Sequence, residues 1–400
     1  MKKVAVFISH PIQYQVPLFK RLAVEPGVDL TVFFFWDFGV QETYDPQFGQ
    51  KVKWDIPLLD GYKSEFLKNI SPDKTSAHFF GEANPELFSR IINGHYDAMI
   101  VFGWQTISHW CAIVTGFLTG TPIFIRGENP FYQEPEKSFL KRIIKHIVLR
   151  GLFKLAAGFF YIGEENRKFY RYYGVPDSKL HFVPYAADND RFMAEAKKLK
   201  PMKDGLKRKL GIQKQQNIIL FSGKLVNGKR PLDLIMAYEK LVREILKKRG
   251  AKPALVFVGN GPIKSDLEEY AKKNMLDQIY FVGFKNQNEL PEFYAMADVF
   301  VLPSGGETWG LVVNEAMCFS IPVIVSSVVS CGKDLIIPGR NGYVFPVGDE
   351  KSLADCLQKV LEQDAVMKKM GKESFKIISR WNFTEDIKGM RKAMGIRNDF

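Results

Sequence analysis

The chain has few cysteines, few histidines and no long apolar run. Four of its 400 residues are cysteine and six are histidine. The cysteines lack CxxC spacing, which argues against a disulfide framework or a zinc site and favours reduced thiols: Cys111, Cys318, Cys331 and Cys356. No apolar run approaches the roughly 20 residues that a membrane-spanning helix needs. The run Val4 to Ile8 is too short for a signal peptide. We therefore expect a cytoplasmic protein that does not cross a membrane.

The remaining composition is that of a globular protein with an excess of positive charge. Hydrophobic residues make up 46% of the chain and charged residues 25%, and the length is sufficient for two domains. The formal net charge of +12 predicts attraction to an anionic partner such as nucleic acid, anionic lipid or a phosphorylated substrate. We expect no nucleic-acid partner, because no recognisable binding module is present.

Short apolar runs alternate with amphipathic stretches along the whole chain. This pattern is typical of parallel sheets covered by helices on both faces. The first series extends from residues 4–8 to 180–184 and the second from 217–222 to 341–346. The predicted fold class is α/β, with two doubly wound Rossmann-like domains facing an interdomain cleft. We expect a first domain at 1–187, a lysine-rich linker at 188–214, a second domain at 215–379 and a C-terminal helix at 380–400 that crosses back.

The most informative stretch extends from Pro303 to Ser326. Its glycines allow a tight turn, and the helix predicted to begin at Gly310 leaves its first amide groups without helical partners, so they favour an anion. Glu307 and Glu315 are roughly two helical turns apart and so can lie near one ligand. Carboxylates suit hydroxyl groups, and the predicted ligand therefore carries both phosphate and hydroxyls, as a nucleotide sugar does.

Four motifs in the second half resemble those of the retaining family 4 glycosyltransferases, which have the GT-B fold. Glu307 to Glu315 is similar to the E-x7-E of that family. The other three motifs, each after a predicted strand, are similar to its SGRL with a downstream lysine, its GxGP loop and the strand end that contacts the base: Ser222-Gly223-Lys224-Leu225 with Lys229, Gly259-Asn260-Gly261-Pro262, and Phe281-Val282-Gly283-Phe284.

The resemblance implies a donor site in the second domain. Lys224 and Lys229 would hold the diphosphate, Glu307 a hydroxyl of the donor sugar, and Glu315 the ribose hydroxyls. Backbone amides near Trp309 would face the diphosphate. The remaining expected donor contacts are Gly223, Gly261, Phe284, Gly306, Thr308, Gly310 and Leu311. No metal is expected, because the helix N-terminus and the two lysines would stabilise charge on the departing diphosphate. No cofactor is expected, because the nucleotide sugar is a substrate. The alternative for the acids and lysines is that they are only solvated surface charges.

The first half departs from the family pattern and resembles a subgroup with an HPIQY-like N-terminus. His10, Arg126 and Glu128 follow predicted strands, where functional residues gather, and we predict catalytic roles for them. The predicted acceptor-side residues are Gln13, Trp36 and Trp54. The alternatives are a turn role for His10, a mutual ion pair of Arg126 with Glu128, and core packing for the aromatic rings.

Two further segments have competing interpretations. Asp188 to Asp190 forms a DxD, but its place after a strand favours a helix cap over a metal ligand. Residues 138–155 form a basic amphipathic helix. That helix either anchors the chain peripherally on the inner face of a membrane or covers the sheet.

The resemblance implies a metal-independent hexosyltransferase that acts with retention of configuration. The expected donor is a UDP-sugar, and the expected acceptor is a saccharide or lipid-linked saccharide in cell-surface polysaccharide biosynthesis. The alternatives are another GT-B enzyme, either a sugar epimerase or a sugar-phosphate synthase, and a nonenzymatic membrane-surface binding protein on the same fold.

Overall fold

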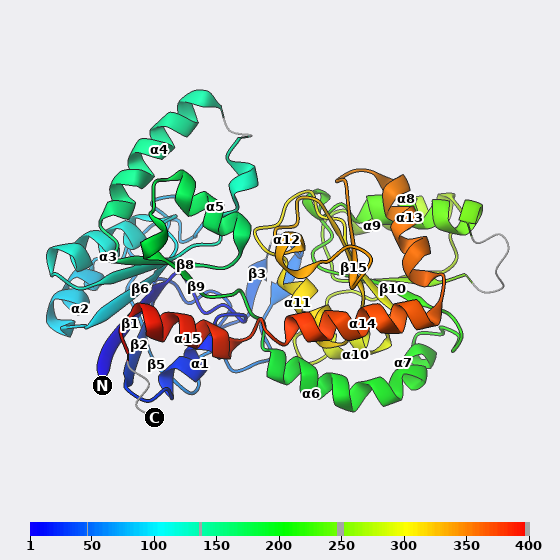
Figure 1. Ribbon diagram of the computed structural model, residues 1–400, viewed down its shortest axis with the longest axis horizontal. Coiled ribbons are helices and arrows are strands. Elements are labelled where there is room, and N and C mark those ends of the chain that lie inside the picture. Colours follow the sequence, from blue (N-terminus) through cyan, green and yellow to red (C-terminus); the bar gives the residue numbers. More distant parts are fainter. Residues whose placement is uncertain (46, 136–137, 246–251, 397–400) are drawn as a thin grey trace. The chain divides into compact units, whose positions relative to one another are not determined.

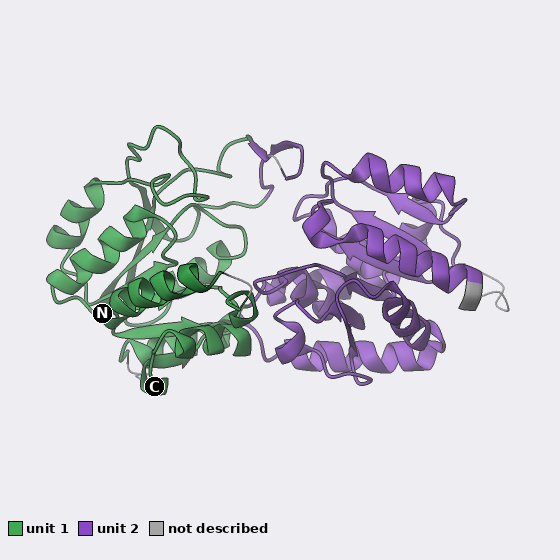
Figure 2. Cartoon of the chain, turned by 90° about the horizontal axis from the view of Figure 1, so that it is seen from above, with its two compact units in different colours: residues 1–43, 56–185, 383–400 green, residues 44–55, 186–382 purple. Residues whose placement is uncertain are grey.

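The computed structural model describes residues 1–45, 47–135, 138–245 and 252–396, and the chain divides into two compact units. Unit 1 comprises residues 1–43, 56–185 and 383–400 (Figure 2). Unit 2 comprises residues 44–55 and 186–382. Residues 44–55 thus belong to unit 2, although the residues on both sides of them in the sequence belong to unit 1.

Unit 1 is built on a seven-stranded sheet with the order β5-β2-β1-β6-β7-β8-β9 among the described residues. Neighbouring strands pair in parallel. Burial on both faces explains the continuous apolar runs, and Val4, Val6 and Phe7 of β1 have no exposed surface. The strands are β1 (Lys2–Ile8), β2 (Val28–Phe34), β5 (Lys63–Phe66), β6 (Ala98–Phe102), β7 (Ile123–Arg126), β8 (Gly158–Tyr161) and β9 (Leu180–Phe182).

Helices surround this sheet, and the last helix of the chain is one of them (Figure 1). They are α1 (Val16–Ala23), α2 (Glu86–Gly94), α3 (Ile107–Leu118), α4 (Phe139–Lys154), α5 (Glu164–Tyr172) and α15 (Phe383–Ala393), with short 3-10 turns η1 (Phe131–Gln133) and η2 (Asp177–Lys179). A buried ion pair fixes α15, because Arg126 Nη1 at the end of β7 lies 3.1 Å from Asp386 Oδ1. The C-terminal segment therefore belongs structurally to unit 1.

Unit 2 has a six-stranded parallel sheet with the order β12-β11-β10-β13-β14-β15 among its described residues. Its strands are β10 (Ile218–Ser222), β11 (Ala254–Val258), β12 (Ile279–Phe281), β13 (Val299–Leu302), β14 (Val323–Ser326) and β15 (Gly342–Phe345). A separate two-stranded sheet joins β3 (Thr43–Asp45) and β4 (Gln50–Val52). The prediction of two doubly wound parallel sheets is confirmed.

The helices of unit 2 include the segment that we expected to be a linker. They are α6 (Asn189–Leu199), α7 (Lys203–Lys209), α8 (Pro231–Lys240), α9 (Lys264–Lys273), α10 (Leu290–Met296), α11 (Leu311–Cys318), α12 (Gly332–Leu335), α13 (Glu350–Leu361) and α14 (Asp364–Ile378), with η3 (Lys200–Met202), η4 (Asn227–Lys229) and the π-helix η5 (Leu241–Ile245). Residues 188–214 thus contain helices that pack in unit 2, because Phe192 and Leu206 enter its core while the lysines are mostly at the surface.

Candidate functional site

The strand order of unit 2 reverses between β10 and β13, and ligands of such sheets bind at this switch point. The loops that follow these two strands are joined by hydrogen bonds. The amide of Gly305 donates to the carbonyl of Gly228 at 2.8 Å, and Ser304 Oγ donates to the same carbonyl at 3.2 Å. The switch point therefore holds the glycine loop against the segment that carries Lys229.

Lys229 and Glu307 meet at this point. Lys229 Nζ forms an ion pair with Glu307 Oε1. The backbone of Glu307 is fixed from below, because its amide donates to the Val328 carbonyl at 3.2 Å and its carbonyl accepts from Ser330 Oγ at 2.8 Å. A cation and a carboxylate from separate motifs are thus brought together where the loops after β10 and β13 meet.

The N-terminus of α11 adjoins the glycine loop. Gly310 precedes the helix with a φ of +103°, a left-handed conformation that favours glycine, and a Cβ atom there would lie 3.2 Å from Leu302 and Val329 side-chain atoms. The Trp309 ring is buried and packs on Trp381 at 5.2 Å. A ligand at this loop is therefore able to contact the backbone of Trp309 but not its buried ring.

The other predicted positions of this loop differ in their access to solvent. Thr308 is exposed, Gly306 and Gly310 are partly buried, and Leu311 is buried.

The three glycine motifs that follow β10, β11 and β12 lie side by side. The amide of Gly223 donates to the Val258 carbonyl and that of Gly259 to the Gly283 carbonyl, both at 2.9 Å. A Cβ atom on Gly259 would lie 1.9 Å from the Gly223 carbonyl oxygen, and one on Gly261 would lie 2.3 Å from that of Leu225. Only glycine permits this approach at the two glycine positions of the GNGP loop.

Lys224 has partners that the sequence motifs did not predict. Its Nζ lies 3.1 Å from Asp45 Oδ2 and 2.8 Å from Gln47 Oε1, both in the segment 44–55. Phe284, the predicted contact to the base, packs against Phe48 and Trp54 of the same segment, with ring centroids 4.9 and 6.4 Å apart. Trp54 therefore lies beside a predicted donor residue, which differs from the acceptor-side position that we expected.

Glu315 lies deeper than expected. Its side chain is completely buried in α11, and Tyr294 Oη donates to its Oε2 at 2.7 Å. Glu307, in contrast, is partly buried. The two glutamates of the E-x7-E are thus separated into a buried and an accessible position.

The corresponding switch point of unit 1 lies between β1 and β6. His10 follows β1, its Nδ1 lies 3.0 Å from Ser9 Oγ, and its ring contacts those of Trp36 and Phe38. Burial lowers the pKa of His10 to about 4, so the imidazole is neutral at neutral pH. The predicted residues His10 and Trp36 therefore do come together.

Glu128 follows β7 and lies in a polar group at the same edge of the sheet. Gln15 Nε2 lies 3.4 Å from Glu128 Oε1 and 3.3 Å from Tyr185 Oη. Burial raises the pKa of the Glu128 carboxyl, whereas hydrogen bonding to Tyr185 and the charge of Arg126 oppose that shift. Gln15, two residues after the predicted Gln13, makes this contact.

Arg126 does not form the ion pair with Glu128 that was the alternative to a catalytic role. Its guanidinium is buried and pairs with Asp386 at 3.1 Å rather than with Glu128, and its Nη2 donates to the Pro184 carbonyl at 3.4 Å. The rings of Phe102 and Tyr185 lie 5.7 and 5.6 Å from the guanidinium carbon. Arg126 therefore ties β7 to the C-terminal helix, which explains its burial without a role in chemistry.

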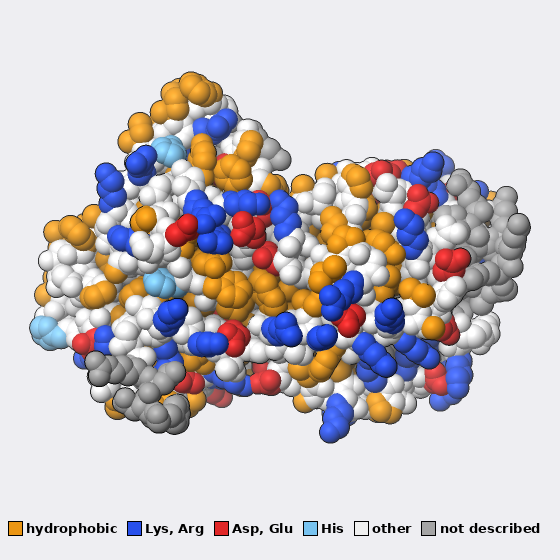
Figure 3. Space-filling view, viewed as in Figure 1, with side chains coloured by type: hydrophobic (Ala, Val, Ile, Leu, Met, Phe, Trp, Pro, Cys, Tyr) orange, Lys and Arg blue, Asp and Glu red, His pale blue; other side chains and the backbone are white. Residues whose placement is uncertain are grey.

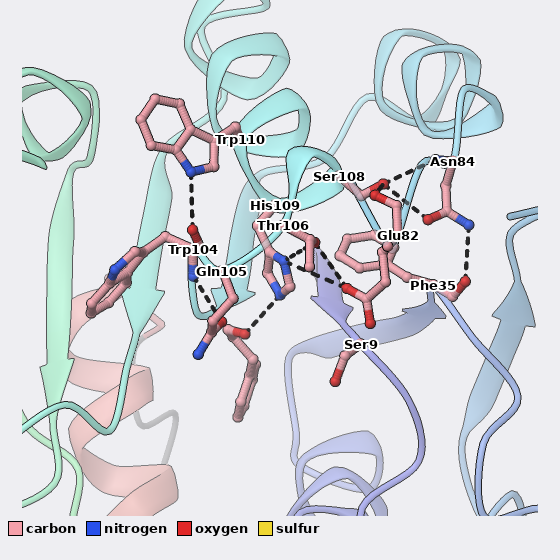
Figure 4. Close-up of polar contacts among 12 residues, drawn as sticks. Ser9, Phe35, Glu82, Asn84, Trp104, Gln105, Thr106, Ser108, His109 and Trp110 are labelled. Atoms are coloured by element: carbon pink, nitrogen blue, oxygen red, sulfur yellow. Dashed lines mark hydrogen bonds and ion pairs between the residues drawn. The ribbon is translucent and has the colours of Figure 1, made fainter. Parts of the chain in front are cut away.

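A buried polar cluster around Thr106, at the start of α3, was not predicted (Figure 4). Thr106 Oγ1 lies 2.9 Å from Glu82 Oε2 and 2.7 Å from His109 Nδ1, and His109 Nε2 lies 3.0 Å from the Phe102 carbonyl oxygen. Burial raises the pKa of Glu82 to about 7 and lowers that of His109 to about 4. No local motif indicates Glu82, because it follows no strand.

The DxD segment caps a helix, as predicted. Asp188 Oδ1 accepts from the amide of Arg191 at 3.3 Å and so caps α6. The Asn189 side chain donates to the carbonyls of Ile378 and Trp381. Within the described ranges, no group of three or more His, Cys, Asp and Glu side chains is arranged to hold a metal ion.

Comparisons with known proteins agree with this geometry. Residues 202–377 match the family model described as glycosyl transferases group 1. The chain is 26% identical over 276 residues to N-acetyl-alpha-D-glucosaminyl L-malate synthase of Bacillus anthracis, covering 68% of this chain and 64% of the relative. It is 38% identical over 161 residues to an uncharacterized glycosyltransferase of Methanocaldococcus jannaschii, covering 40% of this chain and 39% of that one.

A solved structure extends the likeness to nearly the whole chain. HepE of Anabaena, crystallised in complex with UDP, has a TM-score of 0.75 and 16% identity, with 99% of this chain and 100% of that chain covered. The sequence alignments span 64% of the Bacillus anthracis relative and 39% of the Methanocaldococcus jannaschii relative. The fold is therefore GT-B, and residues 202–377 are similar to the glycosyl transferases of group 1.

Proposed function

We propose that this protein transfers a hexose from a nucleoside diphosphate donor, UDP rather than GDP, to a saccharide or lipid-linked saccharide acceptor. The transfer retains the anomeric configuration, requires no metal, and serves cell-surface polysaccharide biosynthesis at the cytoplasmic side of a membrane. Unit 2 binds the donor and unit 1 the acceptor. The UDP complex of HepE, which has the same fold, supports the donor class.

The observation that carries the proposal is the meeting of Lys229 and Glu307 at the switch point of unit 2. The lysine stabilises negative charge on the departing diphosphate, together with the amides at the start of α11. The carboxylate accepts hydrogen bonds from sugar hydroxyls and so orients the donor sugar. Acceptor attack on the face from which the leaving group departs then gives retention.

Unit 1 supplies the acceptor side in this proposal. Glu128 is held by Gln15, and His10 is neutral at neutral pH, so both side chains are able to exchange hydrogen bonds with acceptor hydroxyls. His10 and Trp36 form one wall of that site. Arg126 positions the strand beneath Glu128.

The experiment is an assay of purified protein against UDP- and GDP-sugars in the presence of native acceptor extract. We expect nucleotide release with UDP-sugars, and a loss of roughly 100-fold or more in Glu307→Ala, the magnitude seen when one transition-state contact is removed. Lys264→Ala, a surface change on α9, is the control. Turnover of no donor, or full activity of Glu307→Ala, contradicts the proposal. Conversion of a donor without acceptor would favour an epimerase.

A membrane partner is proposed on a separate observation. Most of the apolar stripe of α4 is exposed instead of covering the sheet, including Phe139 at 74% and Ile147 at 67%. Exposed basic residues accompany it, among them Lys141 and Arg150. Figure 3 shows hydrophobic and basic side chains together at the outer end of this helix. This composition fits an anionic lipid surface. No helix among the described residues is long and apolar enough to span a bilayer.

A further inference from the structure

The segment 44–55 covers the donor motifs of unit 2 although its neighbours in the sequence belong to unit 1. It contains the end of β3 and all of β4, which pair in a two-stranded sheet. Two-stranded sheets of this size have little stability of their own. Its position therefore depends on contacts with the rest of unit 2.

Those contacts reach three of the four donor motifs. Asp45 and Gln47 bond Lys224 of the first motif, as described above. Gln50 Oε1 accepts from Asn260 Nδ2 of the GNGP loop at 2.9 Å. Phe48 packs edge-on against Phe284. The segment thus touches the predicted sites for the diphosphate and the base.

The base of the segment and its tip have different partners in unit 2. Asn286 Nδ2 donates to the Lys53 carbonyl at 2.7 Å, and the Asn288 side chain and amide both donate to Asp55, at 3.0 and 3.1 Å. At the tip the principal charged contact is that of Asp45 with Lys224. A ligand that occupies Lys224 therefore removes the charged contact of the tip and leaves the hydrogen bonds of the base in place.

The Asp45 carboxylate contacts Lys224 with negatively charged oxygen atoms, as a phosphate would. Its two carboxylate oxygens lie 3.1 and 3.4 Å from Lys224 Nζ, and the two side chains are 17% and 26% exposed. The ring of Phe48 lies 4.8 Å from the same ammonium group. A lysine engaged in this way has to exchange these partners before it can hold a diphosphate.

We propose that the Asp45 carboxylate occupies the diphosphate position of the donor site, so that the nucleotide displaces the tip of segment 44–55 on binding. Asp45 and Gln47 thereby set donor affinity. The inference rests on the proposed donor site, but it concerns residues outside all four donor motifs. A bound diphosphate satisfies Lys224, and the released tip no longer has a charged partner there.

Asp45 also organises the turn, which determines the choice of variant. Its Oδ1 accepts from the amides of Gln47 and Phe48 at 2.8 and 3.2 Å. Asn retains an oxygen for these bonds and removes the charge, so Asp45→Asn separates competition from folding of the turn. Asp277→Asn is the matched control, because it removes an exposed carboxylate paired with Lys252 in the same unit.

The first test measures UDP and pyrophosphate binding to the full chain by titration calorimetry. Asp45→Asn should bind both about two- to tenfold more tightly than the wild type, as removal of a partly exposed competing ion pair implies. Asp277→Asn should bind as the wild type does. If the wild type binds UDP and Asp45→Asn binds equally or more weakly, the displacement inference is wrong while the donor site stands. If neither binds, the donor site and the inference both fail.

The second test is hydrogen exchange at the amides of Gln47, Phe48 and Gly49. UDP should increase their exchange, and Lys224→Ala should increase it without any nucleotide. Greater protection in the presence of UDP would mean that the segment clamps the nucleotide instead of yielding to it, which would overturn the proposal.

Discussion

Glu82 shows how a single buried carboxyl group links geometry to pH dependence. His109 Nε2 faces the Phe102 carbonyl and must carry the hydrogen, so the neutral ring leaves Nδ1 as an acceptor. The one hydrogen of the Thr106 hydroxyl then goes to His109, and Thr106 accepts from Glu82. Glu82 must be protonated for this arrangement. The raised pKa of about 7, caused first by burial, agrees with the geometry.

The sign of the resulting pH effect follows from the raised pKa. A carboxyl group whose pKa is raised on folding stabilises the folded state at low pH, and this contribution is lost as the pH rises from the unfolded value of about 4.5 through 7. Glu82→Gln keeps a donor to Thr106 and has no charge to bury. We expect it to exceed the wild type in unfolding free energy at pH 8 by roughly 3 kcal/mol, and to equal it near pH 4.

Chemical denaturation of both proteins between pH 4 and 8 measures this difference. Glu82→Ala is the matched comparison, because it removes the charge together with the hydrogen-bond donor. It leaves the Thr106 hydroxyl without this partner and leaves a cavity in place of the side chain. A wild type and a Glu82→Gln variant with parallel pH profiles would show that Glu82 is ionised in the folded protein.

At the residue scale, the sequence pointed to Lys229 and Glu307, which form an ion pair in the structure, but not to Asp45 or Glu82. The first two occupy loops that directly follow buried strands, and glycines mark those loops. Asp45 lies 179 residues from Lys224, in a segment without any buried run. Glu82 belongs to a loop before α2. Neither position has a local pattern, because its surroundings form only when distant segments pack.

Among the elements, α4 has the clearest functional consequence. Its apolar stripe is too strong for a solvated helix, yet only Leu149, Leu152 and Phe153 are buried in unit 1. Lys145 is engaged by Glu134 at 2.8 Å, so it serves the fold and is unsuitable for charge reversal. Lys141 is exposed and suits that purpose.

We expect α4 to bind vesicles that contain phosphatidylglycerol. Ile144→Ser with Ile147→Ser should reduce binding about tenfold or more, because each exposed isoleucine gains burial in the lipid. Lys141→Glu should also weaken binding. This loss should grow as the salt concentration falls, because repulsion between the new carboxylate and the anionic lipid is then least screened. Flotation of the full chain measures both effects.

Ile337→Ser, which alters an exposed isoleucine of unit 2, is the control and should float like the wild type. Equal flotation of the α4 variants, or binding that does not depend on anionic lipid, would contradict a membrane role for this helix.

Elements with a continuous apolar run were predictable from the sequence. Elements whose structure depends on packing against distant segments were not. Each predicted run of residues 4–8, 180–184, 217–222 and 341–346 overlaps a strand of the structure. β5 was missed because Lys63-Ser64-Glu65-Phe66 lies at a sheet edge and reads as polar. The sequence predicts a linker where α6 and α7 lie, because the many lysines of this segment outweigh its few buried apolar residues, among them Phe192 and Leu206.

For the whole molecule, the two units place different chemistry at equivalent positions. The switch point of unit 2 has a cation, a carboxylate and a helix N-terminus, which suits a sugar diphosphate. That of unit 1 has a neutral histidine, carboxyl groups with raised pKa values and aromatic rings, which suits hydroxyl groups. This division of charge supports a donor unit and an acceptor unit, and the interdomain cleft stays a prediction.

The central claim is that the switch point of unit 2 holds a nucleoside diphosphate through Lys229. Titration calorimetry of UDP against the wild type, Lys229→Ala and the control Lys264→Ala tests it most directly. We predict that Lys229→Ala weakens UDP binding by about tenfold or more, as loss of a charged hydrogen bond implies, while Lys264→Ala binds normally. Equal UDP affinity in Lys229→Ala and the wild type, or no UDP binding by the wild type, would contradict the account.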